Sequence, residues 1–211
     1  VIITGGIDLS VGTALALSAV ACGSLLSQGF PLPIVVLGTL CTGALAGLFN
    51  GAIITLTGIT PFVVTLGSMS IFSGLALIVS GGQTVYGIPA EFSDLLAGFI
   101  GPIPTPIVIA FAVLLVASVV MKSTKLGEYL IAIGGARETA RLAGIKVGFY
   151  TAAAYVISST LASIGAMVTV GRLGAADPAL GGDLLLPAIA AAVMGGADLN
   201  GGEGRKAPVM R

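Results

Sequence analysis

The chain contains 211 residues, of which 56% are hydrophobic and only 9% are charged, with no histidine. A soluble domain carries roughly 25% charged residues, so this composition excludes a soluble globular domain and predicts an integral membrane protein. The lack of histidine also excludes a histidine base and a histidine-bound metal. We therefore predict no catalytic residue, no metal site and no bound cofactor in this chain.

The first element along the chain is a charged break in an apolar run, VIITGGIDLSVG. An Asp at the centre of a bilayer costs about 2.5 to 3.5 kcal/mol, so Asp8 needs a physical reason. Gly5 and Gly6 predict the end of one helix, and Asp8 is suited to cap the next one by accepting from the N–H of Ser10 or Val11. Two interpretations stay open: a helix cap, and a residue on a transport pathway.

Longer apolar segments follow the break, and a transmembrane helix needs about 20 such residues. Turn-forming residues rich in Gly and Pro separate them. A sixth stretch, residues 184–194, is too short to cross a hydrocarbon core of about 30 Å. It is either a re-entrant piece or a span whose upstream end begins at the glycines 181 and 182. The five predicted spans are residues 9–26, 33–56, 62–80, 106–121 and 150–170.

The second predicted span carries Gly43, Gly47 and Gly51, which place a small residue at every fourth position. Such a series forms a groove for close backbone approach by another helix. The partner is either a helix of the same chain or a second copy. Asn50 lies on the same span, and we expect it to hydrogen-bond a neighbouring helix rather than line a pathway.

Basic residues predict the orientation, because short cytoplasmic loops collect Lys and Arg. No basic residue precedes Lys122, and five of the nine fall between Lys122 and Lys146. This loop is predicted to be cytoplasmic, together with the turn at 57–60, and the first break is predicted to lie on or near the inner side. Residues 81–105 and 172–183 then lie outside.

Within the basic loop, the sequence predicts a short helix over residues 136–143. It begins after Gly134 and Gly135 and ends with Gly144 at the C′ position. Glu138 and Arg141 stand three residues apart and are expected to pair. Small or apolar side chains at 140, 143 and 145 predict a compact knob suited to docking in a groove on another protein.

A second motif, GGADLNGG, repeats the first break near the other end of the chain. Broken helices at corresponding places in two halves are typical of transporter repeats that enclose a pathway. The predicted fold is therefore all-α, a polytopic transmembrane helical bundle with broken or re-entrant helices. The candidate residues of the breaks and the pathway are Gly5, Gly6, Asp8, Ser10, Asn50, Gly195, Gly196 and Asp198.

Several motifs in this order resemble one family: GGIDLSVG, NG at 50–51, TPFVVTLGSMSIFSGLALIVSGG, LGEYLIAIGGARETARLAGI and LLLPAIAAAVMGG. From residue 1 to about residue 204 the chain is similar to the permease subunit of bacterial ABC importers for ribose, xylose and related monosaccharides. In that family several more spans lie at each end, so residues 1–211 are interpreted as one incomplete transmembrane permease domain. The tail RKAPVMR departs from the family pattern.

The resemblance implies a homodimeric, multi-pass permease of the bacterial cytoplasmic membrane, surrounded by lipid and without a nucleic-acid partner. It also implies a periplasmic or extracellular sugar-binding protein and a cytoplasmic ATP-binding subunit that uses the ATP. This chain has no Gly-x-x-x-x-Gly-Lys-Ser/Thr phosphate loop of its own. The implied coupling element, which docks on the ATPase, comprises Gly134, Gly135, Arg137, Glu138, Thr139, Ala140, Arg141, Gly144 and Ile145.

Other functions are weighed against this one. The solute is a monosaccharide by resemblance, with a nucleoside or an amino acid as the alternative. An independent secondary transporter would need a basic residue to pair with Asp8, and residues 1–121 contain none. A membrane-embedded enzyme would need a nucleophile with a base, and the chain offers neither histidine nor paired carboxylates.

Overall fold

A computed structural model of the chain describes residues 1–196, and most of these are helical. The described residues also include one short antiparallel hairpin, β1 (Phe99–Ile100) with β2 (Ile103–Pro104). The helices are η1 (Ile2–Thr4), α1 (Val11–Ser27), α2 (Leu32–Thr57), α3 (Pro61–Ser80), α4 (Ala90–Ala97), α5 (Thr105–Ser123), α6 (Lys125–Gly135), α7 (Arg137–Leu142), α8 (Val147–Leu173), η2 (Gly182–Leu184) and α9 (Leu185–Met194). The predicted all-α class is confirmed.

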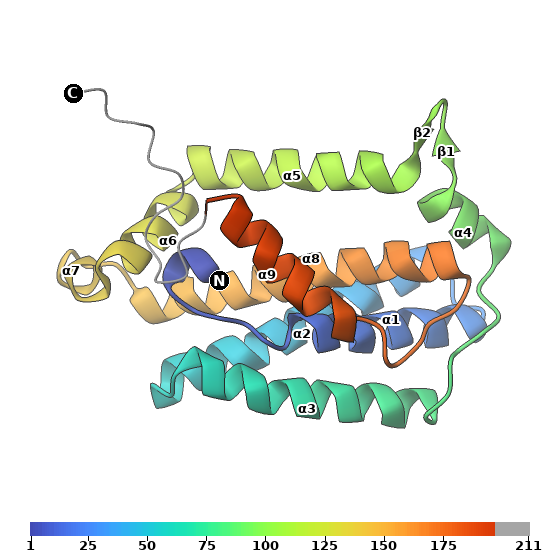
Figure 1. Cartoon of the computed structure of the whole chain (residues 1–211), viewed down its shortest axis with the longest axis horizontal. Helices are drawn as coiled ribbons and strands as arrows, with labels where there is room; N and C mark the ends of the chain where they lie inside the picture. The colour runs from blue at the N-terminus through green and yellow to red at the C-terminus, as the bar shows by residue number, and fades with distance from the viewer. Residues whose placement is uncertain (197–211) are drawn as a thin grey trace.

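The long helices run roughly parallel to one another along the longest axis of the molecule (Figure 1). In that view α8, α2 and α1 lie in the middle, α3 along one edge and α5 along the opposite edge. α6 and α7 lie at one end, whereas α4 and the hairpin lie at the other. α9 crosses the bundle obliquely.

The predicted spans are confirmed to within a few residues, because proline and glycine fix their ends. Pro33, Pro61 and Pro106 stand in the first turns of α2, α3 and α5, where a missing N–H breaks no helical bond. α2, α3, α5 and α8 are long and apolar enough to cross a membrane. α1 has 17 residues and is shorter, because it begins only after the break at Asp8.

The glycine series on α2 packs against α8 of the same chain. A Cβ on Gly47 would meet the backbone of Tyr155 and Val156, and one on Gly43 would meet Ser159. Gly51 is equally close to the backbone of α8. The intramolecular interpretation is therefore confirmed, and this groove does not form a seam with a second copy.

The loops gather at two ends of the bundle as the basic residues predicted. Val85 and Ala176 form a two-way backbone bridge, with N···O distances of 2.8 and 2.9 Å, which joins the two predicted outer loops. At the other end, Gly148 at the start of α8 lies beside Thr55 near the end of α2. The predicted grouping of these loops is confirmed, whereas the first break lies farther along the bundle, beside Asn50 of α2.

The sequence did not predict α4, α6 or the hairpin. α6 is short and amphipathic, so it buries Leu130 and Ile133 while exposing its charged side chains. The sixth apolar stretch forms a helix of ten residues, α9, entered through η2 at Gly182. It is a half-length piece that starts at the glycine pair.

Candidate functional site

The break near the start of the chain is a stretch of non-helical backbone between η1 and α1. Gly5 ends η1 with a φ of 74°, a left-handed conformation that glycine adopts without strain. The next helix has Ser10 as its N-cap and begins at Val11. Unwound backbone inside a membrane protein requires polar partners from the surrounding protein. Side chains from three other helices meet this stretch.

The Asp8 side chain supplies the first contacts. Its Oδ1 accepts the Ser10 N–H at 2.9 Å and the Ser10 hydroxyl at 2.7 Å. The Ser10 hydroxyl in turn accepts a hydrogen bond from Nδ2 of Asn50 on α2, at 2.7 Å. The bond predicted between Asp8 and Ser10 is therefore present, and Asn50 bonds a neighbouring segment as expected. All three side chains are buried.

α3 and α8 hold the same stretch from other sides. Thr65 on α3 accepts the Leu9 N–H at 3.2 Å and lies 3.2 Å from the carbonyl oxygen of Ile7. Tyr155 on α8 is fully buried, and its hydroxyl would lie only 2.5 Å from a Cβ on Gly6, which leaves no room for a side chain there. Sequence reasoning missed both Thr65 and Tyr155. A signal existed for Tyr155, since polar residues recur at positions 151, 155, 159 and 163, four apart, on one face of α8.

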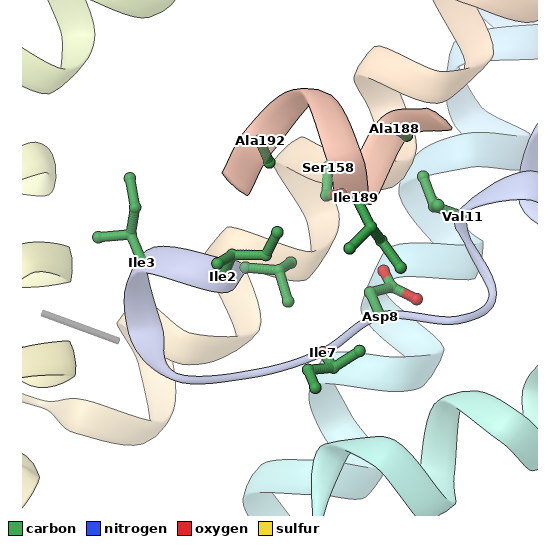
Figure 2. A pocket seen from close by; sticks show the side chains of 10 residues that line it. Ile2, Ile3, Ile7, Asp8, Val11, Ser158, Ala188, Ile189 and Ala192 are labelled. Carbon is green, nitrogen blue, oxygen red and sulfur yellow. The ribbon is translucent and has the colours of Figure 1, made fainter. Parts of the chain in front are cut away.

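A cavity of about 320 Å³ opens beside the break. The N-terminal segment, the start of α1, α8 and α9 enclose it (Figure 2). Its wall is mostly apolar, and Asp8 and Ser158 are the polar side chains among the lining residues. Figure 2 shows the Asp8 carboxylate close to Ile189 and Val11. The lining residues are Val1, Ile2, Ile3, Ile7, Asp8, Val11, Ser158, Ala188, Ile189 and Ala192.

The second glycine break lies at the far end of α9, which begins beside the first break. The loop before α9 contacts the start of α1, where Gly12 and Gly181 touch backbone to backbone and leave no room for a Cβ on either. α9 then ends at Gly195, and Gly196 has a φ of 91°. Both predicted Gly-Gly pairs therefore follow the end of a short helix. Asp198 lies outside the described residues.

The predicted knob is a six-residue helix, α7, at the end of the molecule opposite α4. It has Ala136 as N-cap and is followed by Gly144 in a left-handed conformation, as expected at C′. Arg141 donates to Glu138 Oε1 at 2.8 Å, and both side chains are largely exposed. This hydrogen bond raises the pKa of the Arg141 guanidinium above its ordinary value.

Ala140 is one of the small side chains from which the compact knob was predicted. It is buried against Ile133 of α6 and Val147 of α8 and so lies on the inward face of α7. Ile145 packs at the edge of the same cluster. These side chains hold α7 on the bundle, because a six-residue helix cannot be stable without tertiary packing. The exposed apolar residue of α7 is Leu142, with 78% of its surface accessible.

Apolar helices of membrane length, a polar break among them and an exposed knob at the basic end define a polytopic membrane permease. The chain belongs to the family described as branched-chain amino acid transport system / permease component, which matches residues 1–208. It is a multi-pass integral protein of the bacterial cytoplasmic membrane.

Two curated relatives from Escherichia coli are similar to this chain. The D-allose transport system permease protein AlsC of strain K12 is 36% identical over 97% of the chain and 63% of its own length. The autoinducer 2 import system permease protein LsrD is 37% identical over 97% of the chain and 64% of its own length. The chain thus spans just under two thirds of the relatives it matches. No solved structure matches it.

Proposed function

We propose that this chain is the membrane-spanning permease part of an ATP-driven importer that carries a monosaccharide into the bacterial cell. The observation that carries this proposal is the family match over residues 1–208, in a chain with an exposed knob at its basic end. The permease forms no covalent intermediate. Its helices alternate between inward-open and outward-open states.

ATP hydrolysis belongs to a separate cytoplasmic subunit in this proposal, because the sequence carries no phosphate-binding loop. α7 is the docking element for that subunit. It presents Glu138, Arg141 and Leu142 to solvent, while the buried Ala140 fixes it to α6 and α8. A force applied to α7 would therefore reach α8, which packs along α2 and α1.

The relatives' names support the choice of solute. One is named for D-allose, a monosaccharide, and another for autoinducer 2. The family description names branched-chain amino acids, so an amino acid is the competing solute. A solute-binding protein outside the membrane and a second copy of the permease complete the proposed importer. Both are separate chains from the one described here.

The docking role of α7 is tested with a charged substitution at its exposed tip, Leu142→Arg. The permease is produced with its ATP-binding subunit, and both co-purification and sugar uptake into proteoliposomes are measured. We expect Leu142→Arg to lose co-purification and uptake together, because a charge replaces an apolar contact at the interface. The fold should be unaffected, since Leu142 is 78% accessible.

A matched control is Glu91→Lys, a charge change at an exposed residue of α4 at the opposite end of the molecule. It should leave both co-purification and uptake unchanged. Uptake driven by an ion gradient, without ATP or any ATP-binding partner, would contradict the proposal and favour a secondary transporter.

A further inference from the structure

We infer that Asp8 is a specificity-determining residue that accepts a hydrogen bond from a hydroxyl group of the solute. This inference rests on the proposed function and deepens it, because it names a contact on the route through the membrane. The two oxygens of the Asp8 carboxylate then have different roles. Oδ1 holds Ser10, the N-cap residue of α1, and Oδ2 binds the solute.

The two oxygens of Asp8 have different surroundings. Oδ1 accepts both the N–H and the hydroxyl of Ser10. Oδ2 has no hydrogen-bond partner within residues 1–196, although Asp8 is only 8% accessible. A buried carboxylate oxygen without a partner is costly, and a ligand that supplies a donor would relieve that cost once the cavity wall opens to it. Capping alone uses only one of the two oxygens. Asn50 Oδ1 and Tyr155 Oη, beside the same break, also have no partner within residues 1–196.

The cavity beside Asp8 fits a neutral hydroxylated molecule. Ile7, Val11 and Ile189 give it an apolar wall on which the C–H face of a sugar ring can pack. Ser158 contributes a hydroxyl from α8. Its volume of about 320 Å³ lies at the lower end of the range for small-molecule sites, about 300 to 1,000 Å³.

The charge of the site separates the candidate solutes. A carboxylate accepts hydrogen bonds and repels another carboxylate. The cavity lining contains no lysine or arginine side chain that could bind the carboxylate of an amino acid. An amino acid could pair its ammonium group with Asp8, but its carboxylate would meet no lysine or arginine side chain among the lining residues. A sugar brings hydroxyl donors and no carboxylate, so it suits this site better.

The cavity also lies where a pathway is expected. Asn50 bonds Ser10 at a point about two turns, or roughly 10 Å, before the inner end of α2, which places the break within the membrane. The loop that enters α9 touches the start of α1 at Gly12. Two discontinuous helices that meet at membrane depth are the usual position of a transport site.

The test combines Asp8→Asn with sugars that lack one hydroxyl group. The two donors of Ser10 fix the amide oxygen of Asn on the capping side, so the amide NH₂ replaces Oδ2 and an acceptor becomes a donor. Uptake of D-allose, D-ribose and their monodeoxy analogues is measured in proteoliposomes with the complete importer. The binding protein discriminates equally in both versions, so the comparison of ratios cancels its contribution.

We expect one deoxy analogue to be imported about 10- to 100-fold more slowly than its parent sugar by the unaltered permease, as for a hydrogen bond to a charged acceptor. In Asp8→Asn the parent and that analogue should be imported at equal rates. Co-purification of the ATP-binding subunit should be retained, which checks that the variant folds and assembles. A purely structural Asp8 would not couple to one hydroxyl of the sugar.

A second pair of variants leaves the cap untouched. Ile189→Trp fills the cavity and should abolish uptake, whereas Leu186→Trp on the same helix, at a residue 76% accessible, should not. If Asp8→Asn folds, assembles and keeps the full discrimination between parent and deoxy sugar, the inference is wrong and Asp8 is only a cap. A sodium-dependent uptake that Asp8→Asn makes sodium-independent would also overturn it, in favour of a cation site. Import of amino acids but no sugar would instead refute the proposed function itself.

Discussion

α5 and α8 are both long enough to cross a membrane, yet their surroundings differ sharply. α5 is the more apolar of the two, but only 6% of its most apolar stretch is buried, compared with 39% for α8. Thr105 is the one residue of α5 classed as buried. Hydropathy therefore identifies a helix that suits lipid, and it does not identify a helix that packs on other helices.

What distinguishes α8 is its small and polar side chains. Helices in a bilayer gain little from hydrophobic burial against one another, because lipid tails are equally apolar. They associate through close packing and hydrogen bonds, for which α8 offers Tyr155, Ser159 and Ser163 to the glycines of α2. α5 carries no comparable series of small residues facing the bundle.

The largest effect is expected where α2 and α8 touch. Gly47→Leu places a side chain against the backbone of Tyr155 and Val156, which cannot move away as a flexible side chain would. We expect a loss of more than about 3 kcal/mol of stability, because both helices must separate. The measurement is the unfolding temperature and the yield of monodisperse protein in lipid nanodiscs.

Gly67→Leu is the matched control for that substitution. Gly67 also lies in an apolar helix, α3, but a Cβ there meets no heavy atom within 4 Å. Its unfolding temperature should not fall, and replacing a helical glycine should even raise it. Equal losses in Gly47→Leu and Gly67→Leu would show that the α2–α8 seam does not hold the bundle together.

An intermediate effect is expected when a leucine is shortened in the bundle and on α5. Leu26 at the end of α1 is 3% accessible and packs with Val35 and Phe92, whereas Leu114 on α5 is 63% accessible. Leu26→Ala should cost about 2 kcal/mol or more because it leaves a cavity. Leu114→Ala should change stability by less than about 0.5 kcal/mol, since lipid fills the space.

Chemical denaturation in mixed micelles, with helix content followed by circular dichroism, measures both leucine variants. A large loss in Leu114→Ala would mean that α5 packs on a protein partner rather than on lipid. That result would contradict the comparison drawn here and would direct attention to the face of α5 as an interface.

The comparison of α5 with α8 also explains which features of the structure the sequence could predict. The five long apolar segments, the hydrogen bond from the Ser10 N–H to Asp8 and the short helix before Gly144 were predictable, because each depends on local chemistry. That Ser10 rather than Asp8 is the N-cap of α1 was not predicted. The glycine series predicted that a helix packs closely on α2, but it did not indicate that this helix is α8. Thr65 and Tyr155 were missed because their contacts with the break come from distant parts of the chain.

Ala140 shows a second limit of sequence reasoning, which concerns the faces of a short helix. Its small side chain suggested a docking surface, but on a helix of six residues one face must pack inward to hold the helix in place. The outward face of α7 carries Leu142, whose apolar side chain is not buried by any neighbour. The sequence predicted the short helix, but which of its side chains pack inward depends on α6 and α8, which lie elsewhere in the chain.

The smallest expected effect concerns the hydrogen bond between Asn50 and Ser10, which fastens the break to α2. A double-mutant cycle with Ser10→Ala, Asn50→Ala and the double variant isolates that bond. Buried hydrogen bonds in membrane proteins contribute about 0.6 kcal/mol on average and at most about 1.7 kcal/mol, so we expect a coupling energy within that range. Reversible unfolding in micelles supplies the four stabilities.

A cycle between Ser10→Ala and Thr42→Ala is the control, because the Thr42 hydroxyl bonds only Gly38 of its own helix among the contacts described. That cycle should give no coupling. Zero coupling between Ser10 and Asn50 would mean that the break is held by Thr65 and Tyr155 alone. The α1–α2 contact would then contribute little to stability, as the contacts of α5 do, in contrast to the seam between α2 and α8.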